Sequence, residues 1–271
     1  MATPPAPVHP HPLSGWIVLD KPVGLGSTQA VSAVKRAIRE AGLPRTKVGH
    51  GGTLDPLASG VLPIALGEAT KLAGRMLDAT KAYDFTMRFG EETSTLDAEG
   101  EVVATSDVRP TREQVEAVLP RFTGEIEQLP PAYSALKVDG RRAYDLARAG
   151  KEVPLKSRRV TIHQLLPLGG DVVRSATEGS VTPPPPLRSG TSPKGEELRE
   201  FTLSATVSKG TYIRSLARDI AHALGTVGHV TMLRRTKAGP FTLDQAISLD
   251  FLEEAAKARR LDGAVLPLVA G

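Results

Sequence analysis

A single carboxylate, Asp55, lies in the glycine-rich stretch GHGGTLDPLASGVLP over residues 49–63, which leads into an apolar segment. Three glycines allow the backbone to turn sharply and to approach a ligand closely, because no Cβ is in the way: Gly51, Gly52 and Gly60. Pro56 stiffens the turn beside the carboxylate. The arrangement predicts a nucleophile held still and presented to a bulky substrate. An ordinary Asp-Pro turn, in which the aspartate bonds only the local backbone, is the structural alternative.

A second stretch, VSKGTYIRSLARDIAHALG over residues 207–225, combines a turn with helical periodicity. Its apolar residues recur at helical spacing: Ile213, Leu216, Ile220 and Ala223. Tyr212 and Arg214 are therefore expected at the first turn of a helix that follows Gly210. An arginine at such a place can simply pair with a surface acid.

Two further side chains near Asp55 in the sequence have ambiguous roles. Tyr83 begins the stretch YDFTMRF, whose alternation of apolar and polar residues predicts a half-buried strand. Its ring is either core or a stacking platform for a base. His50 adjoins the Asp55 stretch, where a general acid or base is one option. We prefer stacking and packing for this histidine.

Composition and charge exclude several classes of protein. The chain of 271 residues has no cysteine, so disulfides and thiolate chemistry are excluded, and no residues have zinc-ligand spacing. No apolar stretch approaches the roughly 20 residues that span a bilayer, and the N-terminus lacks the apolar core of a signal peptide. We therefore expect a cytoplasmic protein that needs no metal and no membrane.

Basic residues outnumber acidic ones only slightly, 34 against 30, but they gather in four short groups. These groups are Lys35 with Arg36, Arg141 with Arg142, Lys156 with Arg158 and Arg159, and Arg234 with Arg235 and Lys237. They are either solvated faces or, if the fold brings them together, phosphate contacts. Basic and aromatic residues also alternate between Gln128 and Pro154, which favours RNA contact over an ordinary surface segment.

The remaining sequence indicates the framework. Residues 1–13 are expected to form a flexible tail, followed by a strand over 15–19 and a helix that Ser27 or Thr28 caps and Gly42 ends. Gly24 and Gly26 begin a GxGxxG pattern that residue 29 breaks, so nucleotide binding is not favoured. Further strands are expected over 61–66, 160–166 and 199–207, and helices over 68–77, 112–119 and 249–257. Residues 168–198, rich in proline, glycine and serine, are expected to form a mobile loop.

The run HGGTLDPLASGVLPIALGEATKL and the later SKGTYIR resemble the motifs of the TruB family of pseudouridine synthases, from about Gly15 to about Leu249. The resemblance implies isomerisation of a uridine in the TΨC loop of tRNA, with Asp55 as the nucleophile and no cofactor. Arg214 is then implied to pair with Asp55, an arrangement that favours the ionised carboxylate and fixes its orientation. Tyr83, Tyr212, Leu233 and His50 are implied to contact the target uridine and its loop.

The same resemblance implies the architecture and the RNA contacts. It implies an α+β pseudouridine synthase fold with a mixed, largely antiparallel central sheet and flanking helices, over residues 14–271. An RNA-gripping insertion is implied over 128–157. The residues expected to contact the T-arm stem-loop of tRNA are Lys21, Tyr133, Lys137, Arg141, Arg142, Arg234 and Arg235. For Lys21 we hold support of the loop structure as the alternative.

Three questions stay open at the level of sequence. Asp55 can add to uracil C6, attack ribose C1′, or promote a glycal-like intermediate. A C-terminal PUA domain, common in the family, is expected to be absent, which favours a stand-alone enzyme with no obligate protein partner. A monomer is the default expectation. A non-catalytic tRNA-binding or tRNA-folding protein on the same scaffold is the rival function.

Overall fold

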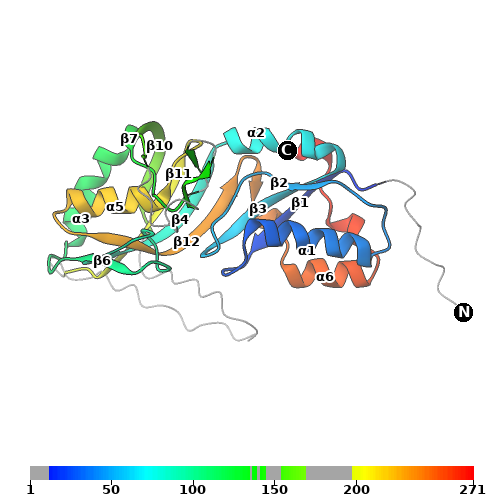
Figure 1. Ribbon diagram of the computed structural model, residues 1–271, viewed down its shortest axis with the longest axis horizontal. Coiled ribbons are helices and arrows are strands. Elements are labelled where there is room, and N and C mark those ends of the chain that lie inside the picture. The colour runs from blue at the N-terminus through cyan, green and yellow to red at the C-terminus, as the bar shows by residue number, and fades with distance from the viewer. Residues whose placement is uncertain (1–11, 135, 139–140, 145–153, 169–196) are drawn as a thin grey trace, which may run out of the picture. The chain divides into compact units, whose positions relative to one another are not determined.

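The structure, a computed structural model, describes residues 12–134, 136–138, 141–144, 154–168 and 197–271 (Figure 1). The principal strands are β1 (Gly15–Lys21), β2 (Val48–His50), β3 (Ala58–Leu66), β4 (Lys81–Phe89), β7 (Gly124–Gln128), β10 (Arg158–Pro167), β11 (Glu200–Val207), β12 (Gly228–Ala238) and β13 (Phe241–Thr242). Two short hairpins pair β5 (Glu91–Thr93) with β6 (Val102–Thr105), and β8 (Lys137–Val138) with β9 (Arg141–Arg142). The α-helices are α1 (Ser27–Glu40), α2 (Ala73–Asp78), α3 (Arg112–Val118), α5 (Ile213–Ala223) and α6 (Leu249–Lys257).

Hydrogen bonds order the principal strands as β1-β3-β12-β4-β11-β10-β7, with β2 joined to β3 and β13 to β12. Strand β3 runs antiparallel to β1 and β2, as β10 does to β7. Strand β3 runs parallel to β12, because Leu233 to Arg235 lie beside Ala58 to Gly60. The expected α+β architecture with a mixed, largely antiparallel sheet is therefore confirmed.

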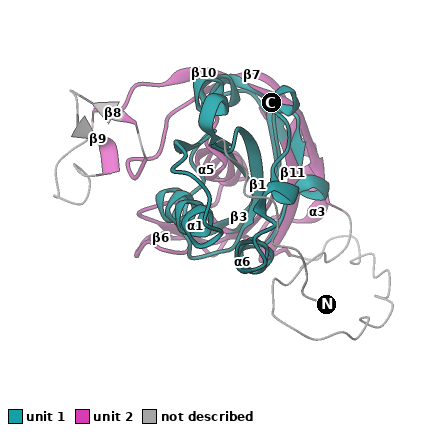
Figure 2. Cartoon of the chain, turned by 90° about the vertical axis from the view of Figure 1, so that its right-hand side faces the viewer, with its two compact units in different colours: residues 1–83, 206–210, 232–271 teal, residues 84–205, 211–231 magenta. Residues whose placement is uncertain are grey.

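The chain divides into two compact units (Figure 2). Unit 1 comprises residues 1–83, 206–210 and 232–271, and unit 2 comprises residues 84–205 and 211–231. The expectation of one catalytic domain over 14–271 stays a prediction. The expected tail over 1–13 and loop over 168–198 lie almost wholly outside the described residues.

In unit 1 the alternating side chains of β1 and β3 feed two apolar cores. Ile17, Leu19, Leu62 and Ile64 pack with α1 and α6 on one face of the sheet. Trp16, Val18 and Val61 pack on the other face with Met76 of α2 and with Phe241. Figure 1 shows α1 and α6 side by side below these strands and α2 above them. Strand β3 is buried along its whole length because apolar layers cover both of its faces.

Helix α1 forms as its periodicity predicts, since Val31, Val34 and Ile38 are buried and Gly42 follows its end with φ +72°. The expected N-cap is wrong. Gly26 precedes the helix, and its N–H donates to the side-chain oxygen of Gln29 at 2.7 Å. The hydroxyl of Ser27 is directed elsewhere, to the Asp55 loop.

Unit 2 has its own buried layer. Strand β11 alternates buried and half-buried residues as expected, with Leu203 and Ala205 fully buried. Helix α5 begins at Ile213 and buries Leu216 and Ile220, so its predicted apolar face is confirmed. The hairpin β5–β6 was not expected, because its sequence EETSTLDAEGEVVAT is mostly polar.

Other boundaries differ from expectation by a few residues. Strand β3 begins at Ala58 rather than at residue 61, since Gly60 and Ser59 pair with β12. The expected helix over 68–77 is a 3₁₀ helix over Gly67–Lys71 followed by α2. Within the part of the chain that the structure describes, no helix is both long enough and apolar enough to cross a lipid bilayer.

Candidate active site

Asp55 lies in unit 1, in the loop between β2 and β3, and its side chain is half-buried. The carbonyl of Asp55 accepts a hydrogen bond from Ala58 N–H at 3.0 Å, which closes a turn with Pro56 at its second position. Gly52 has φ +132° and Gly60 has φ +103°, so glycine is required on both sides of the turn. The turn that the sequence predicts is therefore present.

Every backbone carbonyl from Thr53 to Pro56 accepts a hydrogen bond. Thr53 O accepts from Arg235 Nη1 at 3.0 Å, and Leu54 O accepts from Ser27 Oγ at 2.9 Å. Pro56 O accepts from Gly24 N–H at 2.8 Å and from the Lys21 ammonium at 3.3 Å. These donors come from the end of β1, the segment after it, the start of α1 and β12. They fix the loop from several directions, so the Asp55 carboxylate is attached to a well-held backbone.

Two of these donors, Lys21 and Arg235, were expected to contact RNA; both side chains are buried, and their RNA contacts stay predictions. Lys21 is 0% exposed and Arg235 is 2% exposed. The ammonium of Lys21 also donates to Pro22 O and Leu25 O, and Nε of Arg235 donates to Val61 O at 2.7 Å. Both buried charges bind the loop backbone, which for Lys21 is the alternative role that the sequence left open.

The charge on Lys21 depends on its surroundings. Burial lowers the pKa of Lys21 from 10.5 to about 8, the negative charge of Asp55 raises it, and the guanidinium of Arg235 lowers it further. Lys21 thus lies within the electrostatic reach of Asp55.

Arg234, the third expected phosphate contact in unit 1, forms a two-pronged ion pair with Asp20. Its Nη1 and Nη2 lie 3.0 and 2.7 Å from the two carboxylate oxygens, and Nη1 also donates to Ser59 Oγ. The guanidinium links β12 to β1 and β3 across neighbouring strands. Its contact with RNA stays a prediction, and of the basic group Arg234, Arg235 and Lys237 only Lys237 is exposed.

The residues expected to touch the uridine from unit 1 are partly buried. Tyr83 and Leu233 both pack against the apolar core that includes Leu54. Burial, then the charge of Arg235, lowers the pKa of His50, so its imidazole is neutral at pH 7. His50 Nδ1 accepts from Gly52 N–H at 3.4 Å, a contact within the loop, and its stacking and packing role against the RNA stays a prediction.

In unit 2, Arg214 is buried and forms an ion pair with Asp97. Its Nη1 lies 3.2 Å from Asp97 Oδ2, and both side chains are less than a tenth exposed. Nη1 donates to Thr95 O at 2.7 Å and Nη2 donates to Tyr133 O at 3.0 Å. Arg214 is therefore not a surface ion-pairing residue. Its pairing with Asp55 stays a prediction.

Asp97 was missed at the level of sequence, although the backbone before it is unusual. Leu96 has φ +61°, a left-handed conformation that a non-glycine residue adopts at a cost of about 1 to 3 kcal/mol. The carboxylate of Asp97 also accepts from Thr95 Oγ1 and from Glu99 N–H. The STLD run that forms this turn gives no hint in sequence that its carboxylate is buried.

Tyr212, at the N-cap of α5, is held by two unit 2 residues that the sequence did not single out. Gln128 is fully buried; its side chain accepts from Tyr212 N–H at 2.8 Å and donates to Tyr212 O at 3.1 Å. The guanidinium carbon of Arg158 lies 4.7 Å from the centre of the Tyr212 ring, a cation–π contact. The ring and the backbone of Tyr212 are therefore both oriented.

The expected RNA-gripping insertion is partly described. The ring centres of Tyr133 and Tyr144 lie 6.2 Å apart in an edge-to-face arrangement. In the β8–β9 hairpin, Lys137 pairs with Arg142 and Val138 pairs with Arg141. The side chains of Lys137, Arg141 and Arg142 lie outside the described residues, so their RNA contacts stay predictions.

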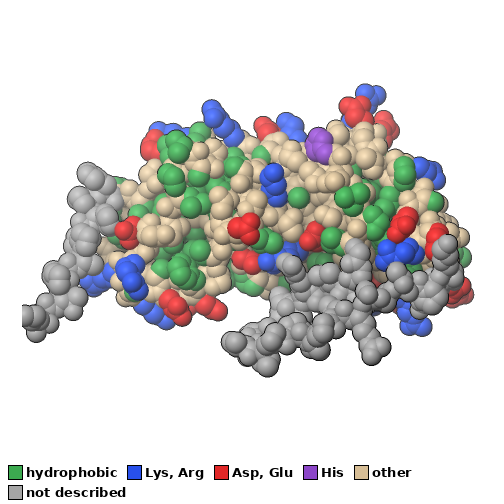
Figure 3. Space-filling model, turned by 180° about the vertical axis from the view of Figure 1, so that it is seen from behind, with side chains coloured by type: hydrophobic (Ala, Val, Ile, Leu, Met, Phe, Trp, Pro, Cys, Tyr) green, Lys and Arg blue, Asp and Glu red, His purple; other side chains and the backbone are tan. Residues whose placement is uncertain are grey.

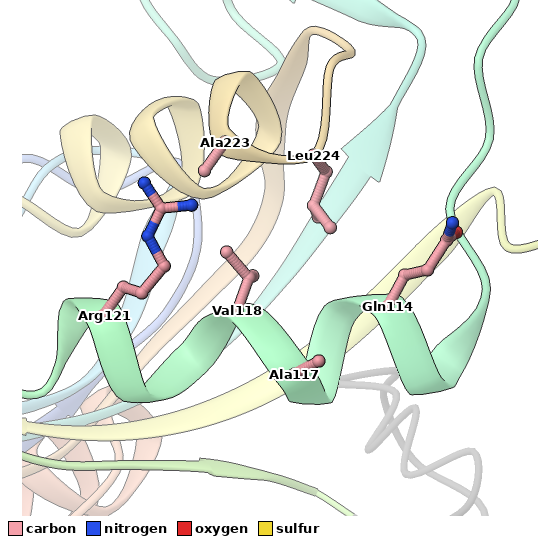
Figure 4. A pocket seen from close by; sticks show the side chains of 6 residues that line it. All are labelled: Gln114, Ala117, Val118, Arg121, Ala223 and Leu224. Carbon is pink, nitrogen blue, oxygen red and sulfur yellow. The ribbon is translucent and has the colours of Figure 1, made fainter.

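One surface hollow of unit 2 carries none of the predicted site residues. An open hollow of about 350 Å³ lies between α3 and the end of α5 and is lined by Gln114, Ala117, Val118, Arg121, Ala223 and Leu224 (Figure 4). Figure 3 shows acidic and basic side chains interspersed on the face that it presents, without a continuous basic patch there.

Comparison with known proteins identifies the family. Residues 39–213 match the family model described as TruB family pseudouridylate synthase (N terminal domain), and residues 214–270 match the tRNA pseudouridylate synthase B C-terminal domain. The chain is 61% identical over 259 residues to a tRNA pseudouridine synthase B of Novosphingobium aromaticivorans, covering 96% of this chain and 78% of that protein. It is 59% identical over 259 residues to one of Zymomonas mobilis, covering 96% and 77%.

Solved structures agree on the fold. A chain of a Cbf5-Nop10-Gar1 complex is similar with a TM-score of 0.63 and 29% identity, over 94% of this chain. A chain of an archaeal box H/ACA sRNP Nop10-Cbf5 complex gives a TM-score of 0.62 and 26% identity, over 95% of this chain. In both cases the match spans 60% of the solved chain. Because both family models match and together span residues 39–270, the chain belongs to the TruB family of pseudouridylate synthases.

Proposed function

We propose that this chain isomerises a uridine in the TΨC loop of tRNA to pseudouridine, with Asp55 as the nucleophile. The observation that carries the proposal is the fixed backbone from Thr53 to Pro56, whose four carbonyls all accept hydrogen bonds. A carboxylate on such a backbone is pre-positioned, which is how enzymes lower the entropic part of a barrier. The names of the relatives, tRNA pseudouridine synthase B, support tRNA as the substrate.

The chemistry needs little beyond this carboxylate. The N-glycosidic bond breaks, the uracil ring rotates, and a C–C bond forms from ribose C1′ to uracil C5, whose proton is lost while N1 gains one. Asp55 adds to uracil C6, attacks ribose C1′, or promotes loss of a C2′ proton; the three routes all require a fixed carboxylate. Tyr83 stacks on the ring, Leu233 and Tyr212 line the uridine pocket, and Arg214 orients the carboxylate.

The target base must leave its stacked loop first, at a cost of a few kcal/mol. Contacts with the RNA backbone offset that cost. We assign them to Tyr133, Lys137, Arg141 and Arg142 of the insertion. Because phosphate contacts release counterions, binding weakens as salt rises.

We further propose that the chain acts as a monomer in the cytoplasm without an obligate protein partner. The Cbf5 relatives were solved in complexes with Nop10, but they share only 26 to 29% of residues with this chain. Activity of the purified chain alone, with its mass measured by light scattering, tests this point. Activity that appears only after a second protein is added contradicts it.

The deciding experiment measures pseudouridine in an unmodified tRNA T-arm transcript, mapped to the nucleotide, without added metal. Wild type is compared with Asp55→Asn and with Asp244→Asn, which removes an exposed carboxylate of the same unit. We expect site-specific product from wild type and from Asp244→Asn, and none from Asp55→Asn, which still binds the RNA. Product from Asp55→Asn would remove the proposed nucleophile.

The rival function is a tRNA-binding or tRNA-folding protein without catalysis. It predicts that wild type and Asp55→Asn both bind the RNA tightly and that neither forms pseudouridine. Both functions can also coexist, because opening the loop to reach a base helps a misfolded tRNA to refold. Refolding activity that survives in Asp55→Asn would then be independent of the chemistry.

A further inference from the structure

The Ser27 hydroxyl does not cap helix α1, although the sequence predicts that Ser27 or Thr28 does so. The first turn of α1 is served by Gly26 and Gln29, so the helix does not need this side chain as its cap. Ser27 is only 6% exposed, and its hydroxyl lies inside unit 1 beside the loop that carries Asp55. The contacts of this buried hydroxyl lie in the Asp55 loop rather than at the helix cap.

That hydroxyl makes two hydrogen bonds to one peptide neighbour. Ser27 Oγ donates to Leu54 O at 2.9 Å and accepts from Leu54 N–H at 2.8 Å. Leu54 itself is 6% exposed, and its side chain belongs to the apolar core of α1 and β3. Leu54 is therefore fixed by both its backbone and its side chain, and the next residue along the chain is Asp55.

Ser27 and Leu54 are each only 6% exposed, so solvent does not readily take the place of the hydroxyl. Without Ser27 Oγ, the buried N–H and carbonyl of Leu54 would both lose their side-chain partner. An unsatisfied buried polar group is costly, so we expect the loop to shift until these groups find other partners. A displacement of about 1 Å at a reacting group lowers a rate by about 100-fold. The backbone of Asp55 is the part of the loop that such a shift moves first.

We propose that Ser27 is a positioning residue for Asp55, acting through the peptide groups of Leu54. The proposal rests on the proposed function, in which Asp55 is the nucleophile. Ser27 contacts neither the carboxylate nor the substrate in this role. It sets the place from which the carboxylate reacts.

The test compares three variants of the full chain: Ser27→Ala, Ser27→Thr and Ser32→Ala. Threonine keeps the hydroxyl. Ser32 supplies the matched control, because its hydroxyl lies on the same helix but is exposed and bonds only Thr28 O. The measurements are the single-turnover rate of pseudouridine formation and the Kd for the T-arm transcript.

We expect Ser27→Ala to lower the single-turnover rate by about 30-fold, with Kd changed by less than about threefold, because positioning acts on the chemical step. Ser27→Thr recovers most of the rate, and Ser32→Ala matches wild type. A Ser27→Ala rate within about threefold of wild type overturns the proposal. So does an equal loss of rate and RNA affinity.

Amide hydrogen exchange separates this proposal from the proposed function. Ala58 N–H reports on the Asp55 turn and Gly24 N–H reports on Pro56, and Ser27 touches neither. Faster exchange of both amides in Ser27→Ala, but not in Ser32→Ala, supports loop positioning even if wild type forms no pseudouridine. Unchanged exchange at both amides overturns the positioning role, whatever the enzyme does.

Discussion

Arg214 and Asp97 lie almost out of contact with solvent, where a charge is tolerated only with partners. Two backbone carbonyls and one carboxylate of unit 2 contact the Arg214 guanidinium. The left-handed backbone at Leu96 indicates that the chain bears some strain to bring Asp97 to this place. The stability of unit 2 should therefore depend on Asp97 far more than on any exposed acid.

Asp97→Asn tests that dependence at the level of one residue. Removing one partner of a buried ion pair typically costs 3 to 5 kcal/mol, so we expect the free energy of unfolding to fall by about 3 kcal/mol. Glu200→Gln is the control, because Glu200 pairs with Arg88 at an exposed site of the same unit and should change stability by less than about 1 kcal/mol. Urea denaturation measures both. Equal effects of the two substitutions would contradict the prediction.

Lys21 gives a pH-dependent prediction. In the unfolded chain its pKa is the ordinary 10.5, whereas burial lowers it to about 8 in the folded protein. Between these values the unfolded state binds more protons, so the contribution of Lys21 makes the free energy of unfolding rise with pH. We expect wild type to gain stability relative to Lys21→Met as the pH rises from about 8 to 10.5. Parallel stability curves for the two proteins would exclude this effect.

At the scale of elements, the parallel pairing of β3 with β12 brings two backbones unusually close. A Cβ at Gly60 would lie 2.2 Å from the carbonyl oxygen of Arg235, and Gly60 has φ +103°. Gly60 is thus required both by its conformation and by its neighbour. The same pairing holds Arg235 where its guanidinium reaches the Asp55 loop.

Gly60→Ala should therefore destabilise the protein by more than about 2 kcal/mol, since left-handed strain and the backbone clash add. Gly74→Ala in α2 is the matched control, because a Cβ there meets nothing within 4 Å. We expect the control to be neutral or stabilising by up to about 1 kcal/mol, as for glycine to alanine in a helix. Thermal unfolding of both variants measures the two changes in stability. A Gly60→Ala protein as stable as Gly74→Ala would show that the pairing tolerates a side chain.

The elements with strong periodicity were predictable from sequence. Helices α5 and α6 form close to where the helical spacing of apolar residues predicts them, and strand β4 forms where apolar and polar residues alternate. The turn at Asp55 was predictable from Pro56 and its glycines. Burial of Lys21 and Arg235 was not, because a cation in sequence indicates a surface, and its carbonyl partners come from distant parts of the chain. Ser27 was assigned to the helix for the same reason, since local caps are visible in sequence and long-range partners are not.

For the whole molecule, the small excess of 34 basic over 30 acidic residues makes the placement of charge matter more than the total. Several basic side chains are already neutralised: Arg234 by Asp20, Arg88 by Glu200 and Lys71 by Glu68. Binding of RNA then depends on the remaining exposed cations and on the insertion.

The contribution of exposed cations to RNA binding is measured by the salt dependence of T-arm affinity. The logarithm of the affinity should fall linearly with the logarithm of the salt concentration. Lys137→Gln should reduce the slope by about 1, as expected for one lost phosphate contact, whereas Lys71→Gln should leave the slope unchanged. If the Lys137 and Lys71 variants share one slope, Lys137 does not contact a phosphate.

The carbonyl of Thr53 receives its hydrogen bond from Arg235, 182 residues further along the chain. Likewise Trp16 Nε1 donates to Leu268 O, 252 residues away. Ribosomes make a chain from its N-terminus, so Asp55 emerges long before the residues that fix its loop. A nascent chain that has not yet reached Arg235 therefore carries the proposed nucleophile without its geometry, and we expect catalytic competence only late in translation.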